Sequence, residues 1–120
     1  MNTDKILYWI PTVVICALMA LSGSMYFFNG EAAADEFTKL GFPTWILIPL
    51  GIAKILGVIA ILTNRSKVLK EWAYAGFFFD GLLAAHAHYS VGEGPWMALA
   101  FCAATILSRV YWPKVFGGAS

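Results

Sequence analysis

The sequence predicts an all-α membrane protein: a four-transmembrane-helix up-down bundle with a short amphipathic helix between the first and second spans. Of the 120 residues, 60% are hydrophobic and only 12% are charged, whereas a soluble domain carries about a quarter charged residues. A soluble chain of this length has no core large enough to hide so many apolar side chains. We therefore expect a single integral membrane domain, 1–120, with lipid as its solvent.

Four apolar segments account for this composition, and each approaches the roughly 20 residues that span a hydrocarbon core. The segments are 6–28, 44–63, 72–90 and 95–112. The first begins like a signal peptide, because Lys5 precedes it, but its apolar run is too long for a typical signal core. We expect a retained helix. Short connections make sequence neighbours antiparallel, so an up-down-up-down bundle is the simplest topology.

The connections between the spans differ in character. Charged and apolar residues alternate over 29–42, which predicts a short amphipathic helix at the interface. Gly41 is a suitable stop for this helix, and Pro43 is a suitable start for the next span. The second connection, 64–71, is short and basic, and the third, 91–95, is a Gly-rich turn.

The basic residues predict an orientation. On one side of a four-span bundle fall Lys5, Arg65, Lys67, Lys70, Arg109 and Lys114. Only Lys39 flanks the other side, so both termini are expected in the cytoplasm. Five tryptophans lie near span ends, as in an aromatic belt: Trp9, Trp45, Trp72, Trp96 and Trp112. A net charge of +1 gives no reason to expect nucleic-acid binding.

Two opposite charges, Lys54 and Asp80, lie near the middle of the second and third spans. A charge at the centre of a spanning helix costs about 2.5–3.5 kcal/mol on insertion scales, so it usually faces the bundle interior and has a partner. Antiparallel packing places the two residues at similar depth. We therefore predict an ion pair or proton-sharing pair between them. Whether this pair serves function or only helix packing stays open at this stage.

Other candidate ligand-binding or proton-handling residues lie on the third span: His86, His88, Tyr74 and Phe77. The two histidines are two positions apart and face different directions, so they cannot bind one haem together. One of them could line the same cavity as Asp80 and relay a proton toward Glu36 or Glu93. The more ordinary interpretation is a histidine near the interface whose hydrogen bonds are satisfied and which has no role in function. Phe77 and Tyr74 could line a flat apolar site, or could only pack.

Several classes of chemistry find no support in the sequence. Cys16 and Cys102 are far apart, form no CxxC motif and are expected to be buried free thiols. No metal-ligand spacing, phosphate loop, nucleophile elbow or dinucleotide fingerprint occurs, so no metal site is predicted and catalytic residues remain unassigned.

Four short motifs occur along the chain: the Ser22-Gly23 pair, FTKLGFP at 37–43, GxxKxxG at 51–57, and KEWAYAGF at 70–77 with a histidine after it. Together these motifs resemble the DoxX-like family of small four-span membrane proteins. The resemblance covers nearly the whole chain and implies a four-helix fold in a bacterial cytoplasmic membrane. Many relatives carry an acid where this chain has Lys54, and a basic residue soon after the Ser-Gly pair where it has Met25 and Tyr26.

The resemblance also implies a functional class. The family is named after a small subunit of a thiosulfate:quinone oxidoreductase, and other relatives are partners in membrane redox complexes or assembly factors. One hypothesis is therefore an accessory subunit of a membrane redox complex that binds a quinone or small apolar ligand, without being an enzyme on its own. The alternative is a non-catalytic interaction or assembly protein that docks on a membrane partner or on itself through small residues such as Ala98, Ala103 and Ala104. A small transporter has less support, because four spans enclose little room.

Overall fold

The computed structural model describes residues 2–116, and its regular elements are all helices. In chain order they are α1 (Thr3–Phe28), α2 (Gly30–Leu40), the 3₁₀ helix η1 (Thr44–Ile46), α3 (Leu47–Thr63), α4 (Lys67–Ser90) and α5 (Trp96–Phe116). The predicted all-α class is confirmed. The four long helices correspond to the four apolar segments, and α2 corresponds to the predicted amphipathic helix.

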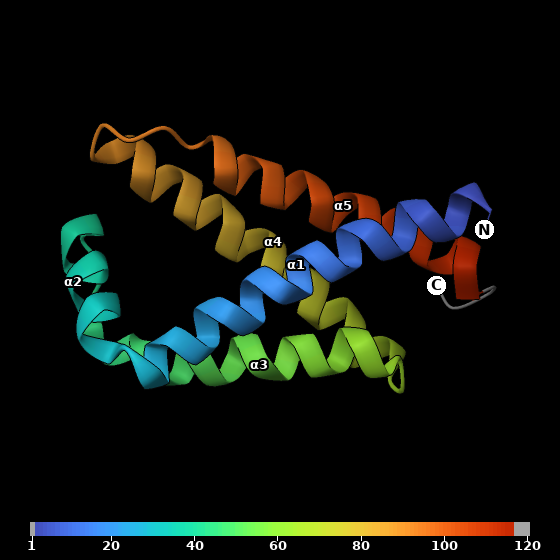
Figure 1. Ribbon diagram of the computed structural model, residues 1–120, viewed down its shortest axis with the longest axis horizontal. Coiled ribbons are helices and arrows are strands. Elements are labelled where there is room, and N and C mark those ends of the chain that lie inside the picture. The colour runs from blue at the N-terminus through green and yellow to red at the C-terminus, as the bar shows by residue number, and fades with distance from the viewer. Residues whose placement is uncertain (1, 117–120) are drawn as a thin grey trace.

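The four long helices form a ring of neighbours, in which α1 and α4 each pack against both α3 and α5. Consecutive long helices run in opposite directions, so the start of α1 and the end of α5 lie together at one end of the molecule, and α2 lies at the other (Figure 1). Within the described residues, two segments are long and apolar enough to cross a membrane: Thr3–Phe28 and Thr44–Thr63.

The helix ends follow from local chemistry. The Ser66 side chain accepts a hydrogen bond from the Leu69 N–H and caps the start of α4, and such a cap satisfies a donor that has no partner inside the helix. At the end of α2, Gly41 has a φ of 86°, in the left-handed region that glycine adopts without strain. The predicted stop at Gly41 is therefore confirmed.

Two predictions about the ends of the apolar segments are wrong. The basic connection expected at 64–71 is shorter, because α4 already begins at Lys67. Lys70 is therefore a helix residue, and it is fully buried rather than exposed. Trp112 is 1% exposed and packs in the core instead of forming part of an aromatic belt. The structural reason is the same for both, since the Lys70 ammonium lies over the Trp112 ring at 4.7 Å.

Buried apolar residues form two clusters. The larger one, at the end where α1 begins and α5 ends, includes Tyr8, Ile15 and Trp112, and the smaller one fixes α2 through Ala33 and Phe37. Large apolar side chains also stay exposed on every long helix: Leu21 (61%), Leu56 (60%), Trp72 (68%) and Met97 (80%). An apolar surface of this extent suits contact with lipid.

Candidate functional site

Lys54 is the centre of a polar group between α1, α3 and α4. It is 8% exposed, and its ammonium donates hydrogen bonds to Ser22 Oγ at 2.7 Å and to the Tyr26 hydroxyl at 2.9 Å. Lys54 Nζ also lies 3.7 Å from Asp80 Oδ2. The ion pair predicted between Lys54 and Asp80 is therefore present. Because 3.7 Å is too long for a hydrogen bond, the Asp80 carboxylate keeps lone pairs for another group.

The fold brings these side chains together through a close approach of α1 to α3. A Cβ atom on Gly23 would lie 3.2 Å from the carbonyl oxygen of Gly51, so glycine at this position lets the two backbones come near each other. Ser22 and Tyr26 are one turn apart on α1 and face Lys54 together. We did not predict either residue as a partner of Lys54. Their spacing of four was the signal in the sequence.

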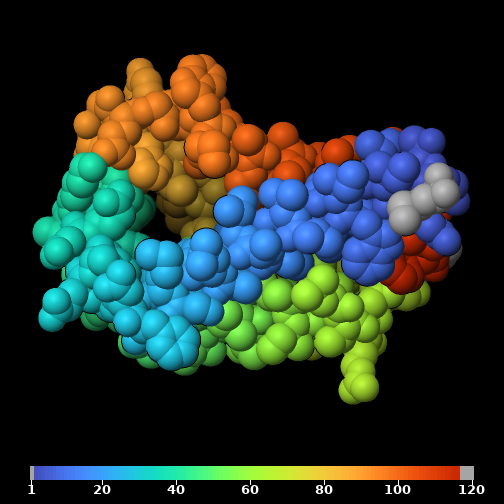
Figure 2. All heavy atoms as spheres, viewed as in Figure 1, coloured from blue at the N-terminus to red at the C-terminus, as the bar shows by residue number. Residues whose placement is uncertain are grey.

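Lys54 and Asp80 lie where two apolar cavities meet. The first cavity, of about 560 Å³, lies between α1, α2, α3 and α4, and the second, of about 640 Å³, lies between α3 and α4. Both are lined by Lys54, Asp80 and Leu50. Figure 2 shows the surface hollowed between α2, the second half of α1 and α4. Both volumes fall within the range usual for small-molecule sites.

The other predicted residues of this site separate into two groups. His88 lines the first cavity and Phe77 the second, so both lie on the same cavities as Asp80. Tyr74 lies elsewhere, because it is buried, hydrogen-bonds to Ser108 Oγ at 2.7 Å and lines a shallow groove between α4 and α5. His86 is exposed. The structure therefore does not bring Tyr74 to the Lys54–Asp80 group.

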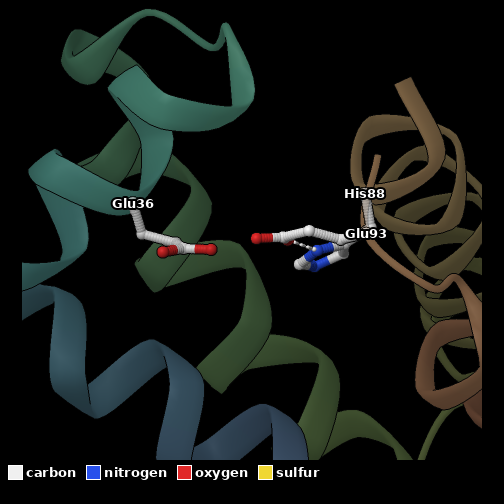
Figure 3. Close-up of side chains that lie close together, drawn as sticks. All are labelled: Glu36, His88 and Glu93. Atoms are coloured by element: carbon white, nitrogen blue, oxygen red, sulfur yellow. Dashed lines mark hydrogen bonds and ion pairs between the residues drawn. The ribbon is translucent and has the colours of Figure 1, made fainter. Parts of the chain in front are cut away.

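A second polar group lies at the α2 end of the first cavity. His88 Nδ1 is 2.6 Å from Glu93 Oε1, and Lys39 Nζ is 2.5 Å from Glu93 Oε2. The hydrogen bond from Lys39, followed by the one from His88, lowers the pKa of the Glu93 carboxyl, while Glu93 raises the pKa of Lys39. Glu36 of α2 lies close to His88 and Glu93, as Figure 3 shows. These contacts tie α2 to the turn between α4 and α5.

The two cysteines match their prediction. Cys16 and Cys102 are both buried and free. Neither lines the cavities beside Lys54.

This arrangement combines an apolar cavity with a small number of charged and hydroxyl groups at one end. An ammonium with two neutral hydroxyl partners and an acid at 3.7 Å can donate to a carbonyl or similar acceptor, and a nearby carboxylate can exchange a proton. An all-helical fold, two helices long and apolar enough to cross a membrane, and an interior charged group are together typical of helical membrane proteins that carry an interior polar centre.

Comparison with known proteins places the chain within this class. The model of the DoxX-like family matches residues 10–109, and the chain belongs to that family. The resemblance drawn from the four sequence motifs is therefore confirmed. Comparisons with curated proteins and with solved structures found no match.

Proposed function

We propose that this DoxX-like protein binds a quinone or a similar small apolar carbonyl compound between its helices, as an accessory subunit of a membrane redox complex. One observation carries the proposal: the Lys54–Asp80 pair lies at the junction of two apolar cavities rather than inside a closed core. Electrons would come from a partner protein, since no cofactor-binding pattern occurs in the sequence.

The lining of the cavities supports an apolar ligand with a polar end. Leu50, Phe37 and Leu83 give the first cavity an apolar wall, and Phe77 adds an aromatic ring to the second. A quinone ring is flat and apolar and carries carbonyl oxygens, which accept hydrogen bonds. The Lys54 ammonium is the donor for such an oxygen, and Asp80 is the group that would hold a proton beside it.

The test is quinone binding by the purified chain in detergent, together with extraction of its bound lipids. We expect quinone in the extract and saturable binding of a short-chain ubiquinone analogue. Removing the ammonium in Lys54→Met should weaken binding about ten- to a hundredfold, the value of a hydrogen bond to a charged group. The exposed Lys114→Met is the matched control, with unchanged binding. Absence of quinone from the extract together with no binding would rule the proposal out.

The same proposal includes four membrane spans with both termini in the cytoplasm of a bacterium. At about 1.5 Å per residue, the 24 residues of α4 and the 21 residues of α5 are each long enough to cross a hydrocarbon core. Charged residues and histidines lower the mean hydropathy of α4, and Arg109 and Lys114 lower that of α5. Reporter fusions in the turn at 91–95 should give an external signal, and fusions at 64–66 an internal one. The opposite pattern would contradict this orientation.

The interaction or assembly role has weaker support from the small residues of α5. Ala104 packs against the main core, and the carbonyl of Ala98 lies near Gly81 of α4. Only Ala103 of the three predicted docking residues is exposed. Crosslinking from Ala103→Cys in intact membranes should therefore recover few partners, whereas efficient capture of one specific protein would favour the assembly role.

A further inference from the structure

Three side chains of types that can bind a metal ion meet at the α2 end of the first cavity. Glu36 comes from α2, His88 from the last turn of α4, and Glu93 from the turn before α5. One ligand atom from each residue lies within 4.8 Å of the other two. Figure 3 shows the Glu36 carboxylate directed across the gap toward Glu93 and the His88 ring. No sequence spacing predicted a metal site, because the three residues belong to separate segments.

We propose that Glu36, His88 and Glu93 form a binding site for a divalent transition-metal ion of the zinc class. An imidazole nitrogen with two carboxylates is a donor set suited to such ions, whereas Ca²⁺ and Mg²⁺ prefer oxygen ligands alone. Lys39 neutralises one of the two carboxylates through Glu93 Oε2. Its ammonium therefore competes with the metal for Glu93.

The geometry needs only side-chain movement to bind the ion. Zinc lies about 2.0–2.2 Å from nitrogen and oxygen ligands, so tetrahedral ligand atoms are nearer to one another than 4.8 Å. The Glu36 side chain is exposed, and those of His88 and Glu93 are 32% and 34% exposed. Rotation of Glu36 toward the other two residues would complete a three-residue site, with a fourth position left for water or ligand.

A metal ion here would hold α2 in place. Besides the ion pair between Lys39 and Glu93, α2 is fixed mainly by Ala33 and Phe37 in the smaller apolar cluster. Glu36 and His88 also line the first cavity. The ion would therefore join α2, which lines this cavity, to the turn between α4 and α5, beside the space that the proposed quinone would use.

The experiment is calorimetric titration of the purified full chain, carrying no histidine tag, with ZnCl₂ and separately with MgCl₂. We expect one saturable zinc site per chain, no comparable magnesium binding, and a higher melting temperature with zinc. Glu36→Gln, at an exposed position, should weaken zinc binding at least tenfold with little effect on the fold. His88→Ala should abolish binding, whereas His86→Ala, an exposed histidine two residues away, is the matched control and should leave it unchanged.

A further variant tests the competition between the Lys39 ammonium and the metal ion for Glu93. Lys39→Met should tighten zinc binding severalfold, because Glu93 Oε2 is then free of the ammonium. Unchanged affinity in Lys39→Met would contradict the assignment of Glu93 as a ligand. The whole site would be overturned by the lack of a saturable zinc isotherm, or by equal losses in His86→Ala and His88→Ala. None of these results depends on quinone binding, so the two proposals fail separately.

Discussion

Two lysines are buried in opposite halves of the bundle, and different kinds of partner surround their ammonium groups. Lys54 has an acid at 3.7 Å and lines two cavities. Lys70 is fully buried, and its ammonium donates to the Tyr8 hydroxyl at 2.7 Å and to Asn64 Oδ1 at 2.9 Å. No ion pair between Lys70 and a carboxylate is found among residues 2–116.

Aromatic rings complete the surroundings of Lys70. Its ammonium lies within 5.0 Å of the ring centroids of Tyr8, Trp112 and Phe116, and such rings attract a cation through their negative faces. The comparison teaches that burial of a charge does not by itself identify a site. Lys70 is fully buried among aromatic rings, whereas Lys54 borders two cavities.

The largest expected difference in stability is between Lys70→Met and Lys54→Met. We expect Lys70→Met to lower the free energy of unfolding by about 2–4 kcal/mol, because it leaves the buried Tyr8 hydroxyl and the half-buried Asn64 side-chain carbonyl without their donor. Lys54→Met should cost about 1 kcal/mol or less, because its neighbours border a cavity. Titration of both variants with a denaturing detergent measures the two losses in the free energy of unfolding. Equal losses would remove the distinction between the two centres.

The next largest difference in stability is expected from removing the tyrosine hydroxyl that accepts a hydrogen bond from each lysine. Tyr8→Phe should cost about 1.5–3 kcal/mol, the value of a hydrogen bond to a charged group in a closed environment. Tyr26→Phe should cost about 0.5–1 kcal/mol, since Ser22 and Asp80 still surround Lys54. The same titration compares the two variants. A Tyr26→Phe loss as large as that of Tyr8→Phe would show that the Lys54 group is also a folding element.

Alanine substitutions at two glycines that line the second cavity test the packing around it. A Cβ atom at Gly57 would lie 2.6 Å from the Phe77 ring, whereas one at Gly76 has nothing within 4 Å. We expect Gly57→Ala to destabilise the fold by about 1–2 kcal/mol through overpacking. Gly76→Ala is the matched control and should stabilise it by up to about 1 kcal/mol through helix propensity. Thermal unfolding followed by circular dichroism measures both, and a stable Gly57→Ala would contradict the tight contact.

The smallest expected effect is the coupling between Lys54 and Asp80. A double-mutant cycle with Lys54→Met and Asp80→Asn should give about 1 kcal/mol or less in stability, because the Asp80 side chain is 28% exposed and the pair is 3.7 Å apart. The coupling for quinone binding should be larger than the coupling for stability. Strict additivity in both measurements would mean that the two charges do not act together.

The sequence by itself determined the helices and the central charge pair. Hydrophobic segments, the helix stop at Gly41 and the matching depth of Lys54 and Asp80 are local or periodic features, and each follows from the length and spacing of a helix. They were sufficient to predict the all-α class, the amphipathic α2 and the ion pair. The motifs were also sufficient to identify the family.

Only the tertiary structure decided which residues surround each charge. Lys70 looked like part of a basic loop, and its burial depends on Tyr8 and Trp112, which are distant in sequence. Tyr74 lies on the same helix as Asp80 but packs toward Ser108 of α5. The meeting of Glu36 with His88 and Glu93 likewise depends on how α2 folds back over the bundle. Side-chain partners across helices are set by rotation and crossing geometry, which hydrophobic periodicity fixes only to within a broad sector of each helix.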